Sequence, residues 1–333
     1  MQFDPVFLSR LQFAFVVSFH IIFPAFTIGL AAWLATIEGV RLATGNPVYR
    51  RVFDFWLRIF ALSFAMGVVS GIVMAFQFGT NWSVLSERTG PIQGPLMLFG
   101  LIFRGVAFEF RYRGAKVFWD SAFCLGSVVA AFVQGAAVGA MIRGIPVKTG
   151  QFAGGAFDWL APLPVLTGIG LVLGYALLGA GWIVLKSDGE LREWARERIS
   201  WLALTLLVVL VVAFDAAFAV RARIGADLGG RLWGLVFPGL GLLAMAGILI
   251  GVRERSDGMP FLMTVVFFIA SFLALAVLFW PYMIPYQVTV ADAAAPEKSL
   301  SFLFWGAGVF VLPVIVIYTA AVYWAFRGKL RHA

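Results

Sequence analysis

The sequence predicts an all-α polytopic membrane protein with about nine transmembrane helices. Hydrophobic residues make up 62% of its 333 residues and charged residues only 13%, with a mean hydropathy of +0.94. Soluble domains have far more polar surface. The apolar runs also match the thickness of a bilayer core, ~20 residues at ~1.5 Å each. These runs fall at 11–38, 53–79, 95–110, 117–142, 160–185, 199–221, 232–251, 260–281 and 303–327.

The distribution of positive charge predicts how these helices are oriented. With the N-terminus outside, 16 of the 25 Lys and Arg residues fall in inside loops and the C-terminal tail. Eight fall outside, and Arg104 lies within the third span. This bias favours an outside N-terminus and an inside C-terminus. Because the basic residues lie between apolar runs rather than on one face, the net charge of +8 does not indicate nucleic-acid binding.

The first span, 11–38, contains a histidine. The span is too long, and too polar at Gln12 and His20, for a cleaved signal peptide. An ionisable residue inside a span is costly and marks function by default. A neutral imidazole among phenylalanines suits axial ligation of a haem iron, whereas the alternative is a histidine that hydrogen-bonds a neighbouring helix. The other histidine, His332, lies in the basic C-terminal tail, where we expect it to be solvated.

The third span, 95–110, contains the buried-charge candidates Arg104 and Glu109. An arginine at this depth is expected to pair with an acid. Glu109 is the nearest acid in sequence, but at i+5 it points partly away, so another helix is an alternative source of the partner. A structural ion pair is favoured over a role in proton transfer.

The fourth to sixth spans contain two further acids and a set of small residues. Asp120, next to Trp119, is expected to lie at the inner edge of the membrane. Asp215, in the sixth span, either faces a polar interior or pairs with Arg104. Cys124 is expected to be a small buried hydrophobe. Close packing of the fourth and fifth spans is predicted by Gly126, Gln134, Gly135, Gly139, Gly168, Gly170, Gly174 and Gly179.

The segments between the later spans are predicted from charge and proline. The charged stretch 191–200 is expected to be a solvated inside loop or a short surface helix. Pro281 and Pro285 should end the eighth span, because proline cannot continue the helical hydrogen-bond ladder. Residues 288–299 are then an external loop.

Two parts of the chain resemble different subunits of one family. The segments LSRLQFAFVVSFHIIFPAFTIGL and FQFGTNWSVLSERTGPIQGPL resemble the start of subunit I of cytochrome bd-type quinol oxidases. The segments MLFGLIFRGVAFEFR, FWPYMIPYQVTVADAAAPEKSLSF and YWAFRGKL resemble subunit II. The resemblance divides the chain into a subunit I-like part, 1–95, with two spans, and a subunit II-like part, 96–333, with seven.

The resemblance implies one haem, with His20 as its axial ligand at the oxygen-reducing centre. Subunit I of the family holds three haems and a quinol-binding loop, and the resemblance to it stops at GPIQGPL, before the helices that carry the remaining ligands. It therefore implies an oxidase component whose quinol site is lost and which is inactive by itself. Its implied partners are other oxidase subunits, membrane lipid and the quinone pool, in the inner membrane of a bacterium.

Two alternative functions remain open from the sequence. The first is a haem-free partner that covers and stabilises a catalytic subunit, as subunit II does. The second is a secondary transporter, which is disfavoured because no clear inverted repeat or pair of broken helices is found in the sequence.

Overall fold

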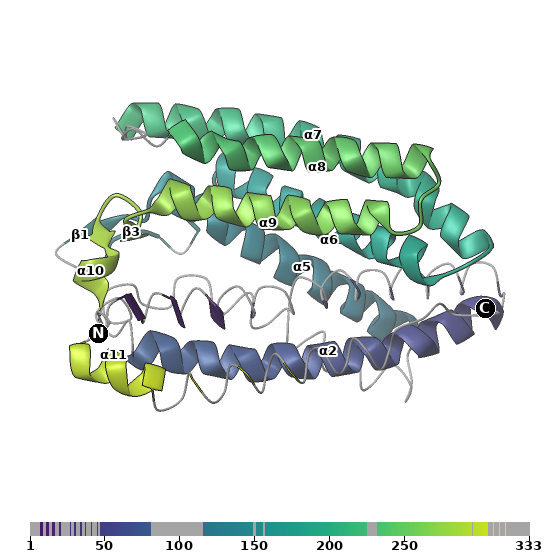
Figure 1. Ribbon diagram of the computed structural model, residues 1–333, viewed down its shortest axis with the longest axis horizontal. Helices are drawn as coiled ribbons and strands as arrows, with labels where there is room; N and C mark the ends of the chain where they lie inside the picture. Colours follow the sequence, from purple (N-terminus) through teal and green to yellow (C-terminus); the bar gives the residue numbers. More distant parts are fainter. Residues whose placement is uncertain are drawn as a thin grey trace.

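The computed structural model describes residues 47–80, 116–148, 151–155, 157–224, 232–294 and 296–305, with single positions between 7 and 45 and at 309, 313 and 317. These residues form helices and two short hairpins (Figure 1). The long helices are α2 (Pro47–Thr80), α5 (Lys116–Arg143), α6 (Pro162–Lys186), α7 (Glu190–Ile224), α8 (Val236–Arg253) and α9 (Met259–Phe279).

The predicted all-α membrane architecture is confirmed. Five helices among the described residues, α5 to α9, are long and apolar enough to cross a membrane. They coincide with the fourth to eighth predicted spans, and α2 covers the second. The predicted span 95–110 lies outside the described residues, and the spans 11–38 and 303–327 are described only at scattered positions.

The long helices run roughly along one common axis and pack around a shared core. In Figure 1, α7 and α8 lie along one side, α2 lies along the opposite side, and α6 and α9 lie between them. Neighbours along the chain, such as α5 and α6, α6 and α7, and α8 and α9, pack against each other. The core contains fully buried side chains from four of these helices: Trp56, Ile183, Ile199 and Ile248.

Proline sets several helix ends. α2 begins at Pro47, and both α6 and α9 have a proline in their first two positions. The first turn tolerates proline because its N–H groups have no intrahelical partner. α9 ends at Phe279, just before Pro281, as predicted.

The prediction that residues 191–200 are only solvated is wrong. They form the first turns of α7, which has 35 residues. At ~1.5 Å per residue such a helix is ~50 Å long, well beyond the ~30 Å bilayer core. Its charged first turns can therefore extend out of the membrane while remaining helical. Arg196 is nevertheless buried there, with only 5% of its surface exposed.

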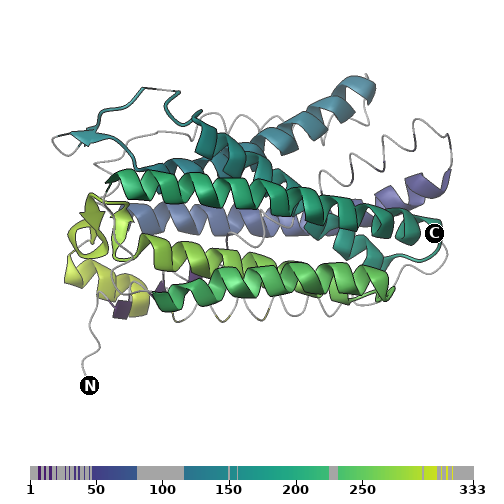
Figure 2. The same cartoon turned by 90° about the horizontal axis from the view of Figure 1, so that it is seen from above.

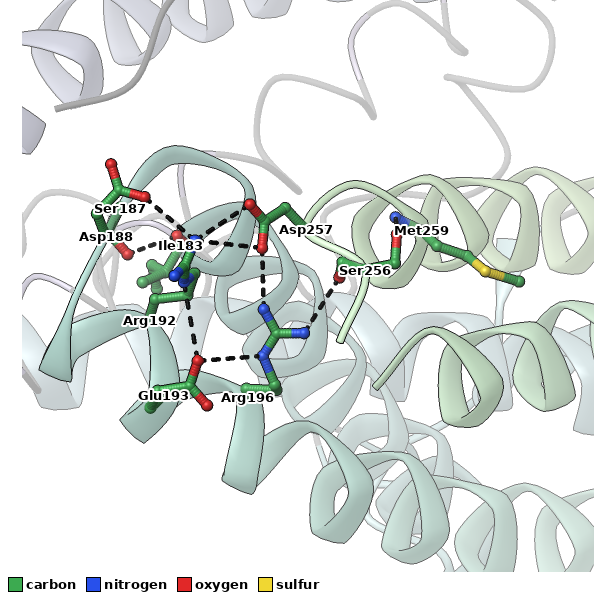
Figure 3. Close-up of polar contacts among 9 residues, drawn as sticks. All are labelled: Ile183, Ser187, Asp188, Arg192, Glu193, Arg196, Ser256, Asp257 and Met259. Atoms are coloured by element: carbon green, nitrogen blue, oxygen red, sulfur yellow. Dashed lines mark hydrogen bonds and ion pairs between the residues drawn. The ribbon is translucent and has the colours of Figure 1, made fainter. Parts of the chain in front are cut away.

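Arg196 is buried in an ion-pair cluster formed with the turn between α8 and α9 (Figure 3). Its Nη2 lies 2.9 Å from Oδ1 of Asp257, and Nη1 of Arg192 lies 3.2 Å from Oδ2 of the same carboxylate. Glu193 lies 3.8 Å and 3.7 Å from the Nε atoms of these two arginines. Arg192 also pairs with Asp188 at 3.1 Å. The cluster joins the start of α7 to the α8–α9 turn.

Short elements cover the opposite end of the bundle (Figure 1). They are hairpin β1 (Val147–Lys148) with β2 (Gln151–Phe152), hairpin β3 (Tyr282–Ile284) with β4 (Val288–Thr289), η1 (Leu232–Leu235), α10 (Val290–Ala293) and α11 (Glu297–Leu303). The predicted external loop 288–299 thus contains β4, α10 and the start of α11. A capping box between Thr289 and Asp292 starts α10.

The positions of the basic residues agree with the predicted charge pattern. The start of α2, with Arg50, lies at the same end of the bundle as the α6–α7 turn (Figures 1 and 2). Arg143, at the end of α5, and Lys298, in α11, lie at the other end, where the hairpins are. Among these described residues, the one assigned to an inside loop and those assigned to outside loops therefore lie at opposite ends of the bundle.

Glycines bring α5 and α6 into close contact, as predicted. A Cβ atom on Gly135 would lie 2.5 Å from the carbonyl oxygen of Thr167 and 2.8 Å from the Cα of Gly168. Only residues without a side chain allow this approach. Cys124, in contrast, is exposed rather than buried. It lies in the first half of α5, where Leu125 and Val128 are also exposed.

Candidate functional site

The candidate site is formed by His20, in the first predicted span, and the middle of α2. Nδ1 of His20 lies 2.9 Å from the hydroxyl oxygen of Ser70, which is 50 positions away in the sequence. Ser70 is buried, with 3% of its surface exposed, and its hydroxyl donates to the carbonyl oxygen of Gly67 at 3.0 Å. The imidazole of His20 is half-buried. α2 thus holds the imidazole through one ring nitrogen.

The imidazole also lies directly against the backbone of α2. A Cβ atom on Gly71 would be 3.2 Å from Cε1 of His20. That separation is tighter than ordinary van der Waals contact, so a side chain at position 71 would push the ring away from α2. Gly71 and Ser70 therefore determine together where the ring lies.

This arrangement fits the axial haem ligand that was expected at His20. Ligating histidines are usually oriented by a hydrogen bond from the ring nitrogen that does not bind the metal. Here Ser70 occupies Nδ1, and the described residues provide no hydrogen-bond partner for Nε2. A haem supplies four nitrogens of its own, so a single histidine can complete one axial position. No cluster of three or more His, Cys, Asp and Glu side chains is found in the described part of the chain.

The other predicted site residues are not brought to His20 by the described structure. Arg104, Glu109 and His332 lie outside the described residues. Asp120 is in the first turns of α5, but its side chain is not among those described. The roles assigned to Arg104, Glu109 and Asp120 therefore remain predictions.

Asp215 lies on an exposed face of α7. Its neighbours Val211, Val212, Phe214 and Phe218 are also exposed, at 48% to 63%. Within the described residues Asp215 thus points away from the bundle core. Its proposed pairing with Arg104 remains a prediction, since Arg104 is not described.

Sequence reasoning missed three polar contacts between segments that are far apart in the sequence. Ser70 pairs with His20, Asp257 pairs with Arg196, and the Tyr175 hydroxyl donates to Oε1 of Gln134 at 2.8 Å. In each pair the partners are at least 41 positions apart. The only local signal was a polar residue within or beside an apolar span, and it gives no indication of the partner.

Family models match both parts of the chain. Residues 91–326 match the model of cytochrome bd terminal oxidase subunit II, and residues 8–108 match that of subunit I. The chain belongs to the cytochrome bd terminal oxidase subunit II family. The subunit I match identifies its first part as related to the other subunit of the same oxidase, as the sequence motifs predicted.

Individual bd oxidase subunits are similar to this chain. The chain is 27% identical over 317 residues to cytochrome bd ubiquinol oxidase subunit 2 of Bacillus subtilis (strain 168), covering 88% of this chain and 90% of the relative. It is 39% identical over 133 residues to cytochrome bd-II ubiquinol oxidase subunit 1 of Escherichia coli (strain K12), covering 36% of this chain. This match spans only 26% of the subunit 1 relative.

The fold also agrees with that of a solved bd oxidase. The structure of bd oxidase from Geobacillus thermodenitrificans superposes with a TM-score of 0.71 at 14% sequence identity. The match covers 96% of this chain and 97% of that chain. The fold of this chain is therefore similar to that of a bd oxidase chain.

Proposed function

We propose that this chain is a haem-binding component of a bd-type quinol:dioxygen oxidoreductase in a bacterial respiratory chain, and that it is incomplete for catalysis by itself. Its partners would be other subunits of the oxidase, and its location the bacterial inner membrane. Membership of the bd oxidase family supports the general role. The observation that carries the haem assignment is the hydrogen bond between His20 and Ser70, which leaves Nε2 for a metal.

The proposal that the chain is incomplete for catalysis is supported by what the subunit I-like part contains. The match to subunit I ends at residue 108, and the chain has only two histidines, of which His332 lies in the C-terminal tail. Oxidation of a quinol releases two electrons, whereas reduction of dioxygen to water takes four. Electrons must therefore be stored in several redox centres at fixed distances. One haem at His20 supplies a single centre, so we infer that the quinol site and electron-entry path are lost.

The division into residues 1–95 and 96–333 is also a proposal. The two family matches overlap over residues 91–108, an interval that contains the proposed boundary. The first part would supply the first two helices of a subunit II-like bundle. Packing of α2 residues such as Trp56 and Phe60 in one core with α6 and α7 supports this proposal.

A haem-free structural role is the second candidate. It is favoured by the extent of the subunit II match, which covers residues 91–326. In that case the chain would cover and stabilise an intact subunit I without binding a cofactor.

Absorption spectroscopy distinguishes the two candidates. The chain is purified in detergent from a host that lacks its own bd oxidase, and its Soret band is compared with that of His20→Ala. The proposed function predicts a Soret band that His20→Ala removes or strongly shifts, and that His332→Ala leaves unchanged. A chain that is colourless by itself, and that co-purifies with an intact subunit I when the two are expressed together, would support the structural role instead.

A further inference from the structure

We infer that Ser70 is a positioning residue: it fixes the tautomer of His20 with the proton on Nδ1 and thereby directs the lone pair of Nε2 to the metal. The tautomer is inferred from hydrogen bonds alone. That Nε2 binds a metal, and that this metal is haem iron, rests on the proposed function.

The direction of the hydrogen bond between Ser70 and His20 follows from which of the two side chains has a proton to donate. The Ser70 hydroxyl has one proton, and the carbonyl oxygen of Gly67, 3.0 Å away, can only accept. The hydroxyl therefore donates to Gly67, as serines in helices commonly do toward the preceding turn. Its oxygen remains an acceptor for Nδ1 of His20 at 2.9 Å. Nδ1 must then carry the proton, and in the neutral ring Nε2 is left with the lone pair.

The surroundings of this pair hold it in place. Ser70 is almost fully buried, and it is part of the continuous helix α2. The backbone at Gly71 limits the ring from the side of Cε1, the carbon between the two nitrogens. A ring held at Nδ1 and in contact at Cε1 has little freedom to rotate. The direction of Nε2 is thus set by α2 as well as by the backbone position of His20.

The hydrogen bond from His20 to Ser70 should also change how strongly the imidazole of His20 binds a metal. When Nδ1–H donates to an acceptor, electron density shifts toward Nε2 and the imidazole becomes a more basic ligand. Loss of such a partner typically weakens metal binding by about 10- to 100-fold. Ser70 would act in this way without contacting the metal itself.

The tautomer can be measured without any haem. His332→Gln leaves His20 as the only histidine, since the chain has two. In this background, ¹⁵N-histidine NMR of the haem-free protein in micelles should report the proton on Nδ1. Ser70→Thr keeps the hydroxyl and should keep this pattern, whereas Ser70→Val, of nearly the same shape, should give a mixture of tautomers. A proton on Nε2 in the parent, or identical spectra for the Thr and Val variants, would overturn the inference.

A second measurement tests the consequence for the haem-loaded protein. Ser70→Val should lose haem to an acceptor protein about 10-fold faster than Ser70→Thr, and the iron–imidazole stretching band in its resonance Raman spectrum should move to lower frequency. Equal haem loss and an unchanged band would overturn the positioning role. Equal elution and melting of the two variants exclude misfolding as the cause. If the parent binds no haem, the proposed function fails, whereas the NMR result still decides the tautomer.

Discussion

Trp56 and Trp182 pack edge to face in the core, with ring centroids 5.9 Å apart and ring planes at 65°. Trp56 comes from α2, in the region that matches subunit I, and Trp182 comes from α6, in the region that matches subunit II. Both are buried, and Trp182 also contacts the ring of Phe261 in α9 at 4.9 Å. This contact joins the two parts of the chain within one hydrophobic core.

Truncation of Trp56 should therefore destabilise the whole protein. Trp56→Ala removes a fully buried side chain and leaves a cavity, at a cost of roughly 3–5 kcal/mol. Thermal unfolding in detergent, followed by loss of the monodisperse elution peak, measures the effect. Trp201→Ala is the matched control, because Trp201 is 77% exposed on α7. Equal melting of both variants would mean that the two parts do not share a core.

Loss of Asp257 should weaken the connection between the start of α7 and the α8–α9 turn. Asp257→Ala leaves the buried guanidinium of Arg196 without its closest carboxylate, and removal of one partner from a buried pair costs about 3 kcal/mol. Urea or thermal unfolding in micelles measures the difference. In the control, Glu197→Ala, the lost carboxylate is 76% exposed beside Arg198, so a change below about 0.5 kcal/mol is expected. A similar loss in both variants would contradict a special role for the cluster.

A methyl group at position 135 should separate α5 from α6. Gly135→Ala places a carbon 2.5 Å from a backbone oxygen that cannot move by itself, and overpacking of this kind costs roughly 1–3 kcal/mol. A lower melting temperature of the purified protein is the expected result. Gly239→Ala, in α8, meets nothing within 4 Å and should be neutral or slightly stabilising. A neutral effect at position 135 would show that α5 and α6 can shift apart without cost.

Cysteine labelling tests the predicted orientation. In a Cys124→Ala background, single cysteines replace the exposed Arg50, Arg198 and Lys298. In spheroplasts, a membrane-impermeant maleimide reaches only the outer face of the inner membrane. It should therefore label only the cysteine at position 298. The cysteines at 50 and 198 should react only in inverted vesicles. Reaction of positions 50 and 198 from opposite sides would contradict the packing of α2 beside α6 and α7.

Oxygen uptake tests the proposed incompleteness. Membranes that contain this chain as the sole candidate oxidase should consume no dioxygen when supplied with a reduced quinol, even if haem is bound. Addition of an intact subunit I provides the positive control for the assay. Cyanide-tolerant uptake by the chain alone, abolished by His20→Ala, would show that a complete electron path exists.

The positions of the long helices could be predicted from the sequence because they depend on local properties. An apolar run of bilayer length must satisfy its backbone hydrogen bonds within itself, so it forms a helix. For this reason the predicted spans 117–142, 160–185 and 260–281 differ from α5, α6 and α9 by only a few residues. Residues 191–200 were predicted incorrectly because composition does not show that a charged segment can extend a membrane helix beyond the bilayer.

The sequence by itself determined the class of protein, its helices, its basic-residue distribution and the family of both parts, as well as His20 as the residue of interest. Only the tertiary structure decided which side chains meet. Ser70 reaches His20 across 50 positions and Asp257 reaches Arg196 across 61, whereas Asp215 faces outward. The physical reason is that helix formation is satisfied within a segment, but a contact between helices depends on how each is rotated and packed against the others, which no single segment specifies.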